Sequence, residues 1–129
     1  MKTFEDYSYQ GYTPEQGDIV TINFDPQEGR EIQKRRPALV VSSTQYNKKT
    51  GFVQLCPITH TNRGAGYFKV RNLAKVDGYI NAVQLRSLDF MSSNRDVHHI
   101  DKIDSATFGM VAQYIVFIFN FEDFIDFDG

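Results

Sequence analysis

A dense group of acidic and basic residues lies between two apolar runs early in this 129-residue chain. The flanking runs are Asp18–Phe24 and Pro37–Val41, and the charged side chains between them are Asp25, Glu28, Arg30, Glu31, Lys34, Arg35 and Arg36. A hairpin connection usually takes about two to five residues, so a loop of this length is more often functional or disordered than a plain connector. Carboxylates can transfer protons and guanidinium groups bind anions, so we expect any chemistry of this protein here first.

The charges are distributed unevenly along the chain, although the net charge at neutral pH is only −2. Residues 17–100 hold twelve Lys and Arg against seven acids, whereas residues 1–16 carry a net −2 and residues 101–129 a net −5. A basic centre between acidic ends is compatible with an anionic ligand, for which nucleic acid is the obvious class. It is equally compatible with charges that only solvate the surface.

Two other groups of reactive side chains indicate structure rather than chemistry. His98 and His99 are adjacent, and neighbouring residues in a strand face opposite sides, so the pair does not readily share a metal. No cluster of Cys or acids at metal-ligand spacing completes such a site. Cys56 is the single cysteine and lies in the apolar run FVQLCPI, which favours a buried thiol. We therefore expect neither a metal site nor another cofactor.

The size and composition are typical of one globular domain. Hydrophobic residues make up 41% of the chain and charged residues 23%, and 129 residues are enough to bury a core. The N-terminus contains no apolar export segment, and no apolar run approaches the roughly 18 residues that span a membrane. We expect a cytoplasmic protein with no membrane partner, in which one domain covers residues 1–129. Within it, residues 1–16 form an N-terminal arm and residues 120–129 an acidic, aromatic tail.

Short β-like runs occupy most of the chain before residue 90. The expected strands are 18–24, 37–41, 52–58, 67–70, 78–82 and 84–88, and residues 43–51 are expected to form a polar connection. After His99, apolar residues recur at spacings of three and four, which predicts a helix capped by Asp101 or Asp104. Its expected buried face consists of Ile103, Ala106, Met110, Val111, Tyr114, Ile115 and Ile118. The fold class is thus mainly β with a C-terminal helix that packs on a small, strongly curved sheet or barrel.

Four segments of the chain resemble, in order, the MazF/PemK (Kid-like) family of toxin endoribonucleases. They are GDIVTINFDPQEGREIQKRRPALVVSS (17–43), YNKKTGFVQLCPIT (46–59), DGYINAVQLRSLDF (77–90) and the C-terminal helix. The first is the most specific, because it joins a strand, Asp-Pro, a polar loop and RPALVV. The resemblance implies a small SH3-like barrel of CcdB-related architecture, which forms a homodimer. It also implies a type II toxin that cuts single-stranded RNA, including mRNA, at short motifs without a metal and is restrained by a cognate antitoxin.

The resemblance assigns three catalytic residues: Glu31 in the charged loop, Arg36 before Pro37, and Thr59 after the third strand. Metal-free cleavage requires the ribose 2′-hydroxyl to attack the adjacent phosphorus. Glu31, with an ordinary pKa of about 4.3, is ionised at neutral pH and can act as the base. The guanidinium of Arg36 matches phosphate oxygens, and the hydroxyl of Thr59 can donate to a non-bridging oxygen. From the residues alone, a surface ion pair between Glu31 and Arg36 is favoured over a catalytic role, and Thr59 could cap a turn.

The expected RNA-binding residues are cations, aromatic rings and polar side chains of the basic centre. Cations contact phosphates and aromatic rings stack on bases. The full set is Arg30, Lys34, Arg35, Tyr46, His60, Arg63, Tyr67, Lys69, Gln84 and Arg86. Phe52 is a further stacking candidate or a core residue.

At two positions the chain departs from the family. Some relatives have His or Ser where this chain has Arg30, and many have an acid where it has Val83, so catalysis by that acid is excluded here. These departures leave two alternatives open: a catalytically inactive RNA- or protein-binding module of the same fold, and a toxin directed at gyrase.

Overall fold

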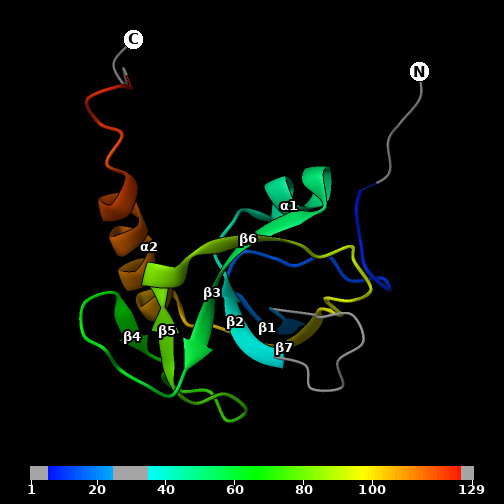
Figure 1. The fold of residues 1–129 in the computed structure, drawn as a ribbon, viewed down its shortest axis with the longest axis horizontal. Helices are drawn as coiled ribbons and strands as arrows, with labels where there is room; N and C mark the ends of the chain where they lie inside the picture. Colours follow the sequence, from blue (N-terminus) through cyan, green and yellow to red (C-terminus); the bar gives the residue numbers. More distant parts are fainter. Residues whose placement is uncertain (1–5, 25–34, 126–129) are drawn as a thin grey trace.

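The computed structural model describes residues 6–24 and 35–125 (Figure 1). In chain order the elements are β1 (Asp18–Asn23), β2 (Arg35–Val40), α1 (Thr44–Thr50), β3 (Phe52–Thr59), β4 (Tyr67–Lys69), β5 (Tyr79–Asn81), the 3-10 turn η1 (Ala82–Gln84), β6 (Arg86–Asp89), β7 (His98–Lys102) and α2 (Ser105–Phe119). This arrangement confirms the predicted class, a mainly antiparallel sheet followed by one C-terminal helix.

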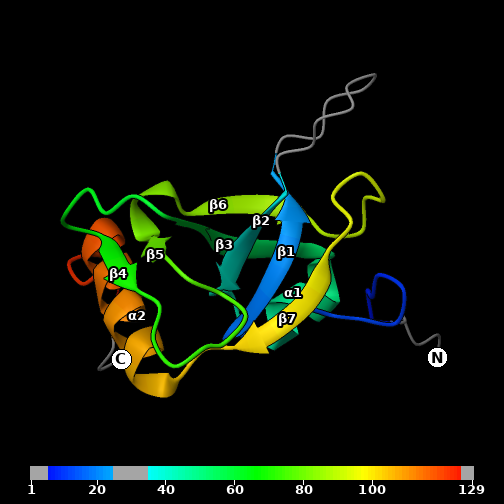
Figure 2. The same ribbon diagram turned by 90° about the horizontal axis from the view of Figure 1, so that it is seen from below.

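β3 connects the two halves of the sheet, because it pairs with β2 along one edge and with β6 and β5 along the other. The strand order is β4-β5-β3-β2-β1-β7, and every pairing is antiparallel. On the edge of β3 opposite β2, β6 pairs with Phe52–Leu55 and β5 pairs with Ile58–Thr59. Pro57 lies where the partner strand changes, a position where its missing N–H is tolerated. Figure 2 shows the result: β4, β5 and α2 lie at one end of the molecule, and β1 and β7 at the other.

Two apolar clusters fill the two faces of the sheet. The strand residues alternate between them: Ile19 and Leu39 pack toward α2, whereas Val20, Ile22 and Val40 pack on the opposite face. The continuous apolar run 38–41 predicts burial on both faces. This holds for Ala38, Leu39 and Val40, which are fully buried, whereas Val41 is only half-buried. Cys56 is also fully buried, and burial raises the pKa of its thiol to about 12, so the predicted structural role is confirmed.

The expectation of a plain polar connection over residues 43–51 is wrong, because α1 occupies this segment. Ser43 caps the helix by accepting a hydrogen bond from the amide of Tyr46 at 3.1 Å, and Gly51 ends it in the left-handed region at φ 76°. Asn47 is buried and donates to the carbonyl of Pro14 at 2.8 Å. A helix of seven residues with mostly polar side chains shows too little apolar periodicity to be predicted.

The C-terminal helix is confirmed, but its predicted buried face is only partly right. Ile103 and Val111 are buried and Tyr114 and Ile115 are half-buried. Ala106, Met110 and Ile118 are exposed, contrary to the prediction. A helix that lies against one sheet buries only the side that faces the sheet, even when most of its residues are apolar. The remaining apolar side chains, mainly those of its last two turns, face outward.

Asp104 is the N-cap of α2, where it accepts from the amide of Thr107 at 2.9 Å and from the Thr107 hydroxyl at 2.8 Å. These bonds hold the pKa of its carboxyl below the ordinary 3.8. We expect Asp104→Ala to lower the free energy of unfolding by about 1 kcal/mol at neutral pH. Because the native-state pKa is depressed, the difference from wild type should be full above about pH 4 and shrink as pH falls further. Urea titrations of both proteins at pH 7 and pH 3 would measure it, and an equal loss at both values would contradict it.

The two terminal segments differ in how they contact the domain. Residues 6–16 fold back on it, and Tyr9 and Tyr12 pack against the cluster that faces away from α2. In Figure 1 the described part of the tail continues beyond the C-terminal end of α2, far from the end of β3. None of the helices within residues 6–24 and 35–125 is long and apolar enough to cross a lipid bilayer.

Candidate active site

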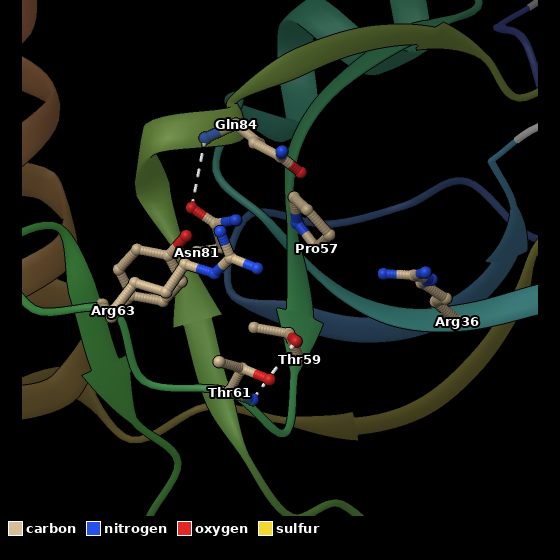
Figure 3. A pocket seen from close by; sticks show the side chains of 8 residues that line it. Arg36, Pro57, Thr59, Thr61, Arg63, Asn81 and Gln84 are labelled. Carbon is tan, nitrogen blue, oxygen red and sulfur yellow. Dashed lines mark hydrogen bonds between the residues drawn. The ribbon is translucent and has the colours of Figure 1, made fainter.

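A pocket of about 200 Å³ opens where β2, β3 and β5 meet the β3–β4 loop (Figure 3). It is lined by Arg36, Pro57, Thr59, Thr61, Arg63, Tyr67, Asn81 and Gln84. In Figure 3 the guanidinium of Arg36, on β2, points into the pocket from the side opposite Thr59 and Arg63. The pocket therefore joins residues that are up to 48 positions apart in sequence.

Thr59 is held in the pocket by its strand and by a close contact with Gly78. It is the last residue of β3 and pairs with Tyr79 of β5. Gly78 has φ 126°, and a Cβ atom at this position would lie 2.5 Å from the carbonyl oxygen of Thr59. Only glycine permits this approach, because it tolerates positive φ and has no side chain. The hydroxyl of Thr59 accepts from the amide of Thr61 at 3.3 Å.

The opposite wall is formed at the end of β5. Asn81 is buried and its side-chain oxygen accepts from the amide of Gln84 at 3.3 Å, which starts the turn η1 and places Gln84 at the rim (Figure 3). Val83 is 54% exposed and lies against Gly66, where a Cβ atom would come within 2.6 Å of its methyl group. Val83 does not line the pocket, so its side chain takes no part in this wall.

The lining of the pocket is cationic and rich in hydrogen-bond donors. Arg36 and Arg63 supply two guanidinium groups, and no carboxylate is among the lining residues that the structure describes. Within the same described part of the chain, neither arginine forms a salt bridge. Guanidinium groups with this freedom form bidentate hydrogen bonds to phosphate oxygens. The pocket is thus suited to a phosphodiester.

The structure brings together five of the residues selected from the sequence: Arg36, Thr59, Arg63, Tyr67 and Gln84. Glu31, Arg30 and Lys34 lie outside the described residues. The other five selected residues lie outside the pocket, and four of them make contacts elsewhere in the structure. These are Tyr46 beside Gln54, Lys69 over the ring of Tyr79, Arg86 over the ring of Phe24, and Arg35 bonded to Thr21 and Asp96. His60 is exposed next to Thr59, and Phe52, at 44% exposure, is not a core residue.

Sequence reasoning missed three lining residues, Pro57, Thr61 and Asn81. Asn81 had a detectable signal, since an asparagine near the end of an expected strand often caps a turn by accepting from a backbone amide. Thr61 follows Thr59 by two positions, the spacing at which a threonine hydroxyl accepts from the backbone. Pro57 becomes part of the site only because β3 changes partners there. In the described part of the chain, no three His, Cys, Asp or Glu side chains gather where they could hold a metal.

The family comparison agrees with this geometry. The sequence pattern of the PemK-like, MazF-like toxins of type II toxin–antitoxin systems matches residues 15–119, and this range contains every residue that lines the pocket. The chain belongs to this family. The resemblance seen in the four sequence segments is therefore confirmed, and the pocket of this MazF-like toxin lies within the part that defines the family.

Individual relatives support the assignment. The endoribonuclease toxin MazF of Escherichia coli K12 is 36% identical over 77 residues, which cover 60% of this chain and 69% of the relative. The crystal structure of MazF from Deinococcus radiodurans superposes with a TM-score of 0.72 at 32% identity, covering 84% of this chain and 98% of that one. The MazE–MazF complex of the same organism gives a TM-score of 0.71 at 27% identity, over 84% and 97% of the two chains. This MazF-like toxin thus shares the fold of the two Deinococcus structures over nearly their full length.

Proposed function

We propose that this protein is the toxin of a type II toxin–antitoxin system and an endoribonuclease that cleaves single-stranded RNA without a metal. The observation that carries the proposal is the single pocket that the guanidinium groups of Arg36 and Arg63 line together with Thr59. The relative from Escherichia coli is an endoribonuclease by name, and the family match covers the whole pocket. We propose that the protein acts in the cytoplasm and that mRNA is its natural single-stranded substrate there.

In the proposed reaction, the ribose 2′-oxygen forms a bond to the adjacent phosphorus and the bond from phosphorus to the 5′-oxygen breaks. A base takes the 2′-proton, and the leaving 5′-oxygen gains a proton. We assign the base to Glu31, whose position in the charged loop lies outside the described residues. Arg36 and Thr59 stabilise the charge that develops on the phosphorane oxygens. The products are a 2′,3′-cyclic phosphate and a 5′-hydroxyl.

Two exposed surfaces, one apolar and one cationic, indicate the proposed partners. The outward side of α2 carries Val116, 63% exposed, and Phe119, 49% exposed, beside an apolar groove of about 440 Å³ that also includes Leu85 and Phe108. An apolar surface of this kind favours association with a second copy, so we propose a homodimer. The cationic pocket favours an acidic antitoxin segment, in line with the MazE–MazF complex of the Deinococcus relative.

The proposal is tested by incubating the purified protein with RNA in EDTA and mapping the new ends. We expect cleavage that leaves 2′,3′-cyclic phosphate ends. A single 2′-deoxyribose at the mapped position should abolish cleavage there, because the attacking hydroxyl is gone. RNA binding without cleavage would instead favour an inactive binding module, and inhibition of gyrase supercoiling without RNA cleavage would favour the other alternative. Cutting that continues at the deoxy position would contradict the 2′-hydroxyl mechanism.

A further inference from the structure

The β6–β7 connection contacts the end of β1 and the start of β2, the two strand ends between which residues 25–34 lie. Asn23 donates its amide to the carbonyl of Arg95 at 2.9 Å, and its side chain donates to the carbonyl of Asn94 at 2.8 Å. Arg95 in turn donates to the carbonyl of Asn23 at 3.0 Å and to that of Phe24. Four hydrogen bonds therefore fix the last residues of β1 to this connection.

Asp96 makes the corresponding contacts to β2. Arg35, the first residue of β2, donates to the backbone carbonyl of Asp96, and its guanidinium lies 3.5 Å from the Asp96 carboxylate. The same guanidinium donates to the hydroxyl of Thr21 at 2.9 Å. The other carboxylate oxygen of Asp96 accepts from the Tyr9 hydroxyl at 3.0 Å and lies 2.8 Å from the ring nitrogen of His98. One carboxylate thus joins β2, β7 and the N-terminal arm.

The backbone of Asp96 adopts an unusual conformation. Its φ is 50°, in the left-handed region that non-glycine residues seldom occupy, although Asp is among those that tolerate it. Such a conformation costs free energy and persists only where surrounding contacts maintain it. Tyr9, which supplies one of those contacts, lies outside residues 15–119, the range that matches the family. The arrangement therefore includes a part of the chain that the family pattern does not cover.

We propose that Asn94, Arg95 and Asp96 form a clamp that positions the start of β2, the strand that carries Arg36. Asp96 and Arg35 are then positioning residues for the cleavage reaction. The proposal rests on the proposed function. It assigns Arg35 to the clamp instead of to RNA phosphates, because its donors already bond to Thr21 and Asp96. The N-terminal arm contributes to the clamp through Tyr9.

The clamp can affect catalysis because Arg35 and Arg36 are consecutive in β2. Arg35 pairs with Asn23 and Arg36 pairs with Ile22, so the contacts of Asn94, Arg95 and Asp96 lie one residue from the pair that carries Arg36. Neighbouring side chains of a strand face opposite sides, which allows Arg35 to anchor the strand while Arg36 faces the pocket. A small displacement of a group that stabilises the transition state lowers the rate strongly.

The test compares single-site variants in steady-state cleavage of a mapped RNA and in binding to the same RNA with 2′-deoxyribose at the cleaved position. In Asp96→Asn the amide oxygen still accepts from Tyr9, but an NH₂ group replaces the acceptor that faces Arg35. We expect kcat to fall about tenfold, with KM and the Kd for the deoxy RNA changed less than about twofold. Tyr9→Phe should lower kcat about threefold, since it removes one contact of the clamp.

Two controls separate positioning from general destabilisation. Tyr12→Phe removes another arm hydrogen bond, the 2.5 Å bond to Asp18, which does not involve the clamp, so kcat should stay unchanged at a temperature where every variant is folded. Arg35→Gln should lower kcat but leave the salt dependence of RNA binding unchanged. A phosphate contact would instead reduce the slope of log Kd against log salt by about 0.7. An unchanged kcat in Asp96→Asn, an equal loss in Tyr12→Phe, or a reduced slope in Arg35→Gln would overturn the proposal.

A second measurement does not depend on activity. The amide of Asn23 is bonded to the clamp, so Asp96→Asn should speed hydrogen exchange in residues 22–24 and 35–37, and Tyr12→Phe should not. Unchanged exchange in Asp96→Asn would overturn the clamp. If the wild type cleaves no RNA, the proposed function fails, and exchange alone decides whether the clamp exists.

Discussion

Replacing Arg36 by alanine is expected to lower kcat by about a hundredfold to a thousandfold, the usual loss when one group that stabilises transition-state charge is removed. Arg36 is exposed at the edge of the pocket, and none of the salt bridges between described residues involves it. Its removal should therefore leave the free energy of unfolding within about 0.5 kcal/mol of wild type. Steady-state cleavage of a mapped RNA and urea denaturation measure the two quantities.

Two variants sharpen this prediction. Arg36→Lys keeps the charge but loses the fork of donors, so it should recover only part of the rate. Arg71→Ala removes an arginine that is also exposed but does not line the pocket, and it should cleave at the wild-type rate. Cleavage by Arg36→Ala near the wild-type rate, with the protein folded, would remove Arg36 from the mechanism.

Gly78→Ala is expected to have the largest effect on stability. At φ 126° an alanine is strained, and its Cβ would lie 2.5 Å from the Thr59 carbonyl oxygen, so the two backbones must move apart. Backbone strain and overpacking each cost about 1–3 kcal/mol, so we expect a total loss of about 3 kcal/mol. The melting temperature should fall by about 10 °C. Because the displaced backbone carries Thr59, kcat should also fall about tenfold when measured below the melting transition.

A matched variant isolates the contact from the strain. Gly11 also has positive φ, at 80°, but a Cβ atom there would meet nothing within 4 Å. Gly11→Ala should therefore cost only about 1 kcal/mol and leave kcat unchanged. If the two alanine variants lose equal stability and equal activity, the close approach to Thr59 has no role in the site.

Six of the strands and the long C-terminal helix could be predicted because their signals are local, whereas β7, with the mostly polar sequence HHIDK, was not among the expected strands. Val20 and Ile22 alternate with Ile19 and Thr21 along one strand, and the run from Ala38 to Val40 is apolar throughout. The short helix α1 could not be predicted in the same way, because its stability rests on Ser43, Gly51 and the buried Asn47 rather than on apolar periodicity.

By itself, the sequence determined the class of fold, the family, and five of the residues that line the pocket: Arg36, Thr59, Arg63, Tyr67 and Gln84. The type of each residue and its position in a motif suffice for that, because a side chain keeps the same chemical groups wherever the fold places it. The tertiary structure alone decided which cations share one pocket and which are engaged elsewhere. Arg35 and Arg36 are chemically identical neighbours, yet pairing of β2 with β1 directs one to Asp96 and the other to the pocket. The physical reason is that strand register and contacts between distant segments set side-chain direction, and neither is encoded within a few residues of the arginines themselves.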